Sequence, residues 1–327
     1  ALPISWDLYK QTTIGIEMIK YFSDAGGYVL FKDYCPYANF IPEDLYNDWL
    51  ENIYCYGVSD YDHPSLLEEA KDLYISLITL GIRVEGQQWL PANDFKNMLG
   101  IIQPMSYVLS QFAPEYFFPY LFLCRIFELN KIADFFNIDL PNIPKRTDYK
   151  GRCMYYWELC EVFYLFRKEN GLSPADLWSF LYDFAPNNLP SEKIDMPKPS
   201  QVWFIGGRLY QEDKSLESKF WQSSPETKKG DILVHYETSP ISAITCIEIS
   251  LTDGVIDPLF RYYGCIYIGN RINIPHITLK ELQTDEYFFK HPLVRKNFQG
   301  VNGWSVNSEN YSELLRMIKT KGFDIEV

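Results

Sequence analysis

The sequence contains no long apolar run and no recognisable export signal. None of its apolar stretches approaches the roughly 20 residues needed to cross a bilayer, and the opening residues, ALPISWDLYK, lack the basic start and apolar core of a secretory signal. We therefore expect no membrane association and a cytoplasmic location. The first residue is alanine rather than methionine, which leaves open whether a further domain precedes it.

Short motifs of common enzyme classes are absent as well. There is no GxSxG elbow, no Walker phosphate loop, no HExxH and no GxGxxG. The four histidines lie far apart in sequence, so the pattern predicts no metal site and no cofactor. The seven cysteines form no CxxC pair, and we expect reduced core thiols rather than disulfides. These patterns predict no catalytic residues.

What the sequence does contain is apolar and aromatic side chains, in a chain long enough for two domains. It has 327 residues, of which 47% are hydrophobic and 17% aromatic. The net charge of −13 is unevenly spread. Residues 1–196 hold 15 basic and 27 acidic residues, a charge of −12, whereas residues 197–327 hold 15 and 16, a charge of −1. The acidic first part favours a protein partner over nucleic acid, while the second part could present a local basic edge.

The first part, residues 1–187, reads as mostly helical. Apolar side chains recur at spacings of three and four in SLLEEAKDLYISLITL, which predicts a helix over 64–80. The same periodicity predicts helices over 42–54, 94–99, 119–137, 155–170 and 174–184, the last of them capped by Ser173. Residues 26–34, GGYVLFKDY, predict a strand, or a loop at the two glycines. The aromatic-rich stretch near residues 163–186 is interpreted as core, with a partner-binding groove as the alternative.

A proline-rich segment separates this part from the rest. Residues 185–200 carry four prolines among polar residues, which predicts an extended linker at 188–199. Beyond it the period changes to short β-branched and aromatic runs, QVWFIGG, DILVHYE, ISAITCIEIS and GCIYIGNRINI, which are typical of strands. Helical spacing returns near Leu279 and over 308–321. The predicted fold class is α followed by α+β, with a small mixed β-barrel domain at 200–327.

The order of features in this second part resembles a known family. WFIGG opens a strand, Trp221 follows in what reads as a loop, KKGD precedes the next strand, VHYETSPISAITCIEIS forms a hairpin, and HPLVRKNFQGVNG leads into a last helix. This order resembles EVE domains of the PUA-like superfamily and, more distantly, YTH and ASCH domains. A departure from the pattern is the long aromatic loop around 254–263. The resemblance implies a module that reads a modified or flipped base, linked to restriction, defence or RNA processing.

A base taken from its stack is held by aromatic faces and by hydrogen bonds to its edge. The candidate pocket residues are Trp203, Phe204, Trp221, Tyr236 and Trp304, and the resemblance adds Thr238 and Ser239 as hydroxyl or backbone contacts. The candidate contacts to phosphate or to a base edge are Arg208, Lys219, Arg295, Lys296, Asn297 and Gln299. Each aromatic residue could instead belong to the barrel core, and the Arg295–Gln299 segment could be a solvated turn.

Three functions follow from this reading. The leading hypothesis is a noncatalytic reader of a modified base in DNA or RNA, or of a nucleotide, with the acidic helical domain binding a protein partner. The second is an interaction scaffold in which the barrel pocket is vestigial. The third is an enzyme acting on a nucleotide or base, with Asp231 or His235 as the reactive group beside the pocket.

Overall fold

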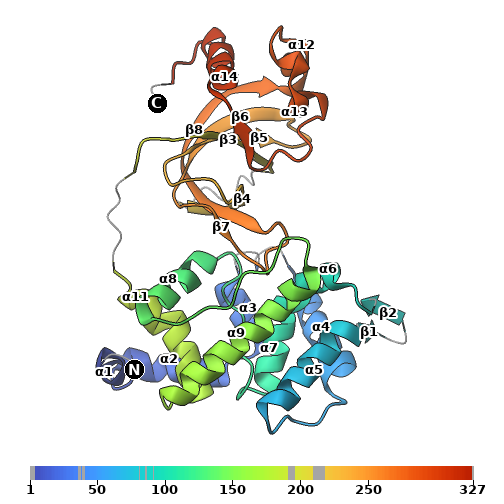
Figure 1. Cartoon of the computed structure of the whole chain (residues 1–327), viewed down its shortest axis with the longest axis vertical. Coiled ribbons are helices and arrows are strands. Elements are labelled where there is room, and N and C mark those ends of the chain that lie inside the picture. Colours follow the sequence, from blue (N-terminus) through green and yellow to red (C-terminus); the bar gives the residue numbers. More distant parts are fainter. Residues whose placement is uncertain are drawn as a thin grey trace. The chain divides into compact units, whose positions relative to one another are not determined.

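The computed structural model describes residues 4–35, 38, 41–80, 82–84, 87–90, 92–190, 196–208 and 218–325. The chain divides into two units, which are described separately (Figure 1). The first unit is Ala1–Ser191 together with Pro258–Arg261, and the second is Glu192–Asp257 together with Tyr262–Val327. Helices dominate the first unit and a curled mixed sheet forms the second, so the coarse layout is as predicted. Among the described helices, none has both the length and the apolar composition needed to cross a membrane.

The first unit is built from helices with one small hairpin. Its elements are α1 (Ile4–Tyr9), α2 (Thr13–Asp24), α3 (Gly27–Tyr34), α4 (Glu43–Ile53), a π-helical turn (Tyr54–Val58), α5 (Leu67–Leu80), β1 (Ile82–Val84), β2 (Gln87–Leu90), α6 (Phe95–Met98), a 3-10 turn (Leu99–Ile101), α7 (Ile102–Phe112), α8 (Ile126–Phe136), α9 (Tyr149–Glu169), α10 (Pro174–Ser179), a second π-helical turn (Phe180–Phe184) and α11 (Ala185–Asn188).

Aromatic side chains fill the core of this unit, and several of their hydroxyls donate to backbone carbonyls. Tyr156 and Trp157 of α9 are fully buried. The Tyr156 hydroxyl donates to the Phe118 carbonyl, and the Tyr74 hydroxyl donates to the Cys153 carbonyl. Such bonds let large rings pack without leaving a buried hydroxyl unpaired. The aromatic stretch near residues 163–186 is largely core, because Phe180 and its neighbours Leu181 and Tyr182 are buried.

Arg152 is one of two buried arginines described in this unit, the other being Arg167. Arg152 lies on α9 at 1% exposure. Its Nε donates to the Pro258 carbonyl at 2.8 Å, Nη2 donates to the Phe260 carbonyl at 2.7 Å, and Nη1 donates to the Arg146 carbonyl. Backbone carbonyls thereby replace the water that a guanidinium would otherwise keep.

Two predictions for this unit are corrected. Residues 26–34 form helix α3 rather than a strand or loop, with Gly27, Leu30 and Phe31 buried at helical spacing. Gly27 serves close packing, since a Cβ there would lie 3.0 Å from Leu50 Cδ1. The helix predicted over 119–137 begins only at Ile126, because the segment before it uses side-chain acceptors such as Ser106 Oγ for its backbone N–H groups. The Ser173 cap is confirmed as a full capping box with Asp176.

The second unit contains seven described strands. They are β3 (Val202–Gly207), β4 (Ser218–Gln222), β5 (Ile232–Glu237), β6 (Ala243–Ser250), β7 (Val255–Ile256), β8 (Gly264–Thr278) and β9 (Trp304–Val306). The order across the sheet is β4-β8-β6-β5-β3-β9, with β7 paired to β8. All pairs are antiparallel except β3 and β5, which are parallel. The four strands predicted from β-branched runs are confirmed as β3, β5, β6 and β8.

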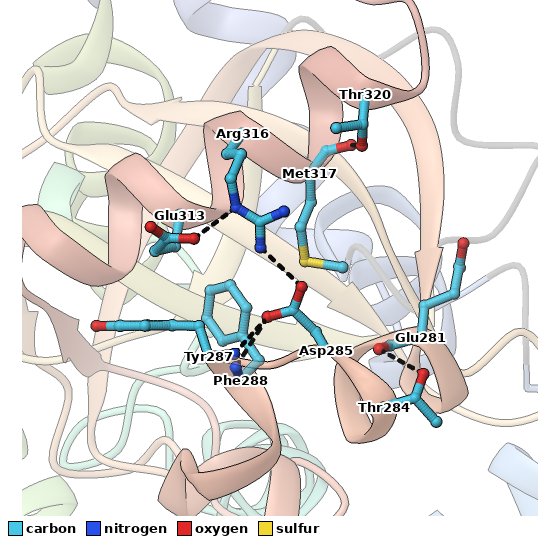
Figure 2. A network of polar contacts seen from close by, with 9 residues as sticks. All are labelled: Glu281, Thr284, Asp285, Tyr287, Phe288, Glu313, Arg316, Met317 and Thr320. Atoms are coloured by element: carbon cyan, nitrogen blue, oxygen red, sulfur yellow. Dashed lines mark hydrogen bonds and ion pairs between the residues drawn. The ribbon is translucent and has the colours of Figure 1, made fainter.

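Helices cover one face of this sheet. They are α12 (Leu279–Thr284), a 3-10 turn (Phe288–Lys290), α13 (Pro292–Arg295) and α14 (Ser308–Thr320). Their apolar side chains pack with Phe204, Tyr236 and other inward residues into one core, the helix-covered core. Figure 2 shows polar contacts of α14 with its own turn and with the residue that follows α12. Arg316 of α14 donates through Nε to Glu313 Oε2 at 2.6 Å and through Nη2 to Asp285 Oδ2 at 2.7 Å.

The sheet curls into a half-barrel (Figure 1). β4 lies at one end of the strand order and β3 near the other, yet the ring of Trp221 on β4 lies over Gly207 on β3. Asn302 joins the same two strands: its Oδ1 accepts from the Gly206 N–H at 2.8 Å, and its Nδ2 donates to Gln222 Oε1 at 3.2 Å. The curl creates an inner face, opposite the helix-covered core.

Candidate functional site

The predicted aromatic pocket is divided between the two faces of the half-barrel. Successive side chains of a strand point to opposite faces. On β3, Trp203 therefore joins the inner face with Leu233, whereas Phe204 joins the helix-covered core. Tyr236 also lies in that core, where its ring stacks on Phe298 at 4.0 Å. Phe204 and Tyr236 accordingly do not line one pocket with Trp203.

The remaining pocket candidates are also placed apart. Trp304 on β9 is partly buried and packs against the helix-covered core. Thr238 is half-buried and Ser239 is exposed, just beyond the end of β5. The structure brings Ser239 to one other candidate, since Arg208 Nε donates to its carbonyl at 3.2 Å.

Trp221 lies on strand β4 and not in a loop, which corrects the prediction. Its ring is partly buried against the inner-face residues and contacts His235 edge-on, with 4.8 Å between ring centroids. A Cβ on Gly207 would lie 2.5 Å from Cζ2 of this ring. Glycine at 207 is thus required for the indole to lie across β3. The backbone of the neighbouring candidate Lys219 pairs in β4, and its side chain lies outside the described residues.

Beside Trp221, three strands contribute a polar triad of His235, Glu248 and Arg271, of which His235 and Glu248 are buried. His235 on β5 is fully buried, and its Nδ1 lies 3.0 Å from Glu248 Oε2. Glu248 on β6 is 2% exposed, and its Oε1 accepts from Nε and Nη2 of Arg271 on β8 at 2.8 and 2.6 Å. The Arg271 side chain keeps 29% exposure. The triad therefore runs from the interior of the half-barrel to solvent.

The charges of the triad follow from competition between burial and pairing. Burial alone would raise the pKa of Glu248, but the hydrogen bond and charge of His235 and the guanidinium of Arg271 together hold it below its ordinary value. Burial would lower the pKa of Arg271, and the Glu248 carboxylate raises it instead. Glu248 is thus an anion that accepts hydrogen bonds on both oxygens.

This arrangement fixes the hydrogen on His235. A carboxylate only accepts, so Nδ1 must carry the hydrogen that it shares with Glu248. Nε2 is buried and has no hydrogen-bond partner among the described residues. Since a buried nitrogen without a partner is unfavourable, it marks a position where a polar group of a ligand would be stabilised.

Cys246 lies next to the triad and completes a set of possible metal ligands. Ligand atoms of His235, Cys246 and Glu248 lie within 4.8 Å of one another. Burial raises the pKa of the Cys246 thiol to about 12, which keeps it protonated and disfavours a nucleophilic role. Both Glu248 oxygens are already engaged, and Arg271 adds a positive charge beside them. The set therefore fits hydrogen-bond recognition better than a cation.

Asp231, the other group considered for catalysis, has a structural role. Its Oδ1 accepts from the backbone N–H of Gln201 and from both the backbone and the hydroxyl of Ser200. Its Oδ2 accepts from Trp203 Nε1 at 2.8 Å and from the Lys228 N–H at 2.9 Å. Burial would raise the pKa of Asp231, but these bonds hold it below its ordinary value. A carboxylate bonded this fully has no lone pair well placed to accept a substrate proton.

The predicted basic edge lies on the other side of the sheet from Trp221. Arg295 ends α13, and the buried residues of that helix belong to the helix-covered core. Arg295 and the three other polar residues of this segment, Lys296, Asn297 and Gln299, are exposed. Asn297 Oδ1 accepts from Gln283 Nε2 at 3.0 Å. This placement favours the alternative reading of a solvated turn, and Arg271 supplies the cation on the inner face instead.

Sequence reasoning found His235 only as an enzymatic alternative, and it did not find Glu248 or Arg271. The sequence did contain a signal for these residues, namely titratable side chains inside predicted strands. His235 lies two residues after Leu233 on β5 and therefore on the same face, and Glu248 interrupts the apolar run of β6. A charge inside an apolar strand is rare without a partner.

Comparisons with known proteins add little information about this site. No protein-family model matches the chain, and a search of curated proteins found no match. Among solved structures, the chain is similar to the NMR structure of Rpa0253 from Rhodopseudomonas palustris, at 13% sequence identity and a TM-score of 0.32. The match covers 37% of this chain and 94% of that one. At this level of similarity we infer nothing from the likeness.

Proposed function

We propose that the second unit is a noncatalytic recognition module of the PUA-like, EVE type, which takes up a modified or flipped base on the inner face of its half-barrel. The observation that carries the proposal is the partly buried indole of Trp221 beside a triad whose innermost nitrogen, His235 Nε2, has no partner among the described residues. An aromatic face with a hydrogen-bonding group at its edge is the chemistry that holds an unstacked base.

The triad also suggests how a base edge would be recognised. His235 Nε2 would form a hydrogen bond with a polar group on the edge of the base. Two Arg271 nitrogens bond to Glu248, and the exposed part of the guanidinium can reach a carbonyl or phosphate oxygen. Glu248 holds both groups in place. The near-neutral charge of residues 197–327 means that Trp221 and the triad, rather than nonspecific attraction to phosphate, would supply the affinity.

The test is binding by the whole chain to matched oligonucleotides. Fluorescence anisotropy would compare DNA and RNA strands that carry one 5-methylcytosine, 5-hydroxymethylcytosine or N6-methyladenine with the unmodified strands. We expect tighter binding of at least one modified strand and a loss of about fivefold to tenfold in Trp221→Phe, since stacking on one ring contributes about 1–3 kcal/mol and phenylalanine keeps part of it.

Trp304→Phe is the matched control. Trp304 is also a partly buried tryptophan of the second unit, but it packs on the opposite face. Its substitution should leave the affinity unchanged. Equal binding of modified and plain strands, together with no effect of Trp221→Phe, would contradict the proposal and favour an interaction scaffold.

An enzymatic role for the same site has one supporting observation. The His235 and Glu248 pair holds Nε2 as a potential general base. A nucleotide bound within hydrogen-bond distance of Nε2, together with turnover that is lost in His235→Gln, would show that the site is catalytic rather than a recognition site.

A further inference from the structure

The first unit contains a cavity that base recognition does not use. It lies between α3, α4 and α7 and has a volume of about 390 Å³. Pockets for small ligands have volumes of roughly 300–1,000 Å³. The cavity is therefore large enough to hold a ligand or a side chain of a partner.

Aromatic side chains form much of its wall. Tyr54, His63, Tyr107 and Phe112 all line it. The His63 ring stacks on Phe112 with 4.1 Å between centroids. Tyr107 is fully buried, and its hydroxyl accepts from Gln103 Nε2 at 2.8 Å, which fixes this ring in place. Tyr54, at 47% exposure, lies toward solvent.

The packing around Gly27 keeps the helices that bound the cavity close together. A Cβ at this position would lie 3.0 Å from Leu50 Cδ1 and 3.2 Å from Tyr107 Cβ. Helix α3 therefore lies close against α4 and α7, and a larger residue at 27 would have to displace its neighbours by a few tenths of an ångström. The wall is thus formed by the packed fold before any ligand binds.

The described wall carries one carboxylate and one imidazole. Glu51 of α4 and His63 line the cavity, and no lysine or arginine is among the described lining residues. The surrounding sequence is acidic as well, with a charge of −12 over residues 1–196. Ring faces carry a negative electrostatic potential, so the exposed ring of Tyr54 and one carboxylate, beside the stacked pair of His63 and Phe112, attract a cation of low hydration. An anionic ligand would meet no compensating charge there.

From these observations we propose that the cavity binds an organic ammonium group, either free or on the lysine side chain of a partner peptide. The rings contact the alkyl groups around the nitrogen, and Glu51 supplies the counter-charge. The site belongs to the first unit, so its test is independent of the test of base recognition by the second unit. It also gives a defined binding point to the protein partner expected for the acidic helical region.

The experiment measures binding to the whole chain by calorimetry or by ligand-observed NMR. Choline is compared with 3,3-dimethylbutan-1-ol, its uncharged counterpart of equal shape, and a trimethyllysine tripeptide is compared with the same peptide carrying norleucine. We expect the cations to bind and the neutral partners to bind at least fivefold more weakly. Glu51→Gln should weaken cation binding about fivefold, because it removes one charge at a partly enclosed site.

Two variants make the test specific. Tyr54→Ala removes an exposed ring without opening the core, and it should also weaken cation binding. Glu68→Gln removes an exposed acid of α5 that does not line the cavity, and it should leave binding unchanged. Tighter binding of the peptide than of choline would assign the site to a protein partner, and the reverse would assign it to a free amine. Equal binding of charged and neutral ligands, or no effect of Glu51→Gln, would overturn the proposal.

Discussion

Replacing Glu248 by glutamine should destabilise the second unit strongly, because the substitution leaves the partly exposed guanidinium of Arg271 facing a buried neutral amide. Removing one partner of a buried ion pair costs about 3–5 kcal/mol. Glutamine keeps one carbonyl acceptor, and Arg271 retains 29% exposure, so water can solvate part of its charge. We therefore expect a loss of about 2–3 kcal/mol in the free energy of unfolding.

A second glutamate provides the matched control. Glu313 meets Arg316 at 2.6 Å, the same distance that separates Glu248 from Arg271, but the side chains of this pair are 32% and 46% exposed (Figure 2). An exposed pair contributes less than about 1 kcal/mol, so Glu313→Gln should have little effect. The two substitutions differ in the burial of the pair that they break and in the remaining partners, since Arg316 keeps its bond to Asp285 while Glu248→Gln also weakens the contact with His235.

The assay must report each unit separately, since a chain of two units need not unfold in one step. Pulsed thiol labelling in urea followed by mass spectrometry meets this need. Cys265 is fully buried in the second unit and Cys160 is nearly so in the first. Glu248→Gln should lower the urea midpoint of Cys265 labelling and leave that of Cys160 unchanged. A shift no larger than that of Glu313→Gln would refute the reasoning.

Acid provides a second check on the same substitution. The pKa of Glu248 in the folded protein lies below its ordinary value of 4.5. A depressed pKa contributes stability that is fully present above 4.5 and is lost as the pH falls through the folded pKa. The stability gap between the wild type and Glu248→Gln should thus be full at neutral pH and close progressively below about pH 4.5.

Three further substitutions test the fold. Gly207→Val should push the Trp221 ring out of its position, since a Cβ there lies 2.5 Å from the indole, and tryptophan fluorescence should shift toward the emission of an exposed ring. Trp203→Phe removes the bond from Nε1 to Asp231 and should lower the urea midpoint of the second unit by an amount equivalent to about 1–2 kcal/mol. Ser173→Ala removes a helix cap and should cost the first unit about 1 kcal/mol, measured in the same way.

Each of these has its own control. Gly100→Ala adds a Cβ with no atom within 4 Å, so it should be neutral. Trp6→Phe removes a buried Nε1 that has no partner among the described residues, so it should cost less than Trp203→Phe. Ser173→Thr keeps the capping oxygen and should retain most of the stability. Equal effects of each variant and its control would contradict the corresponding explanation.

The strands of the second unit were predictable because their signal is local. β-branched and aromatic runs bounded by turn residues marked β3, β5, β6 and β8. The segment that became α3 was not predictable in this way, since a short apolar run has the same composition in a helix and in a buried strand. Its helical state depends on tertiary packing of Gly27 against Leu50 and Tyr107, which no local pattern contains.

The candidate site was predictable only in part. Period-two alternation already implies that Trp203 and Phe204 face opposite sides, so grouping them in one pocket was an avoidable error. The register that places Glu248 between His235 and Arg271 depends on two irregularities in the pairing of β6 with β8. Bulges of this kind follow from the curl of the whole sheet, and the sequence of one strand does not specify them.

The Asn302 bridge has a consequence for the chemical lifetime of the protein. Asn302 precedes Gly303, and an asparagine followed by glycine is the pair most prone to deamidation, in which the glycine amide attacks the side-chain carbonyl. Here the Gly303 N–H is bonded to the Phe204 carbonyl and Asn302 Oδ1 is held by the Gly206 N–H, so the native fold restrains both reactants. Opening of the half-barrel would release them together. Conversion to aspartate would then remove the donor that bonds Gln222, so a transient opening would cause a covalent change that persists after the half-barrel closes again.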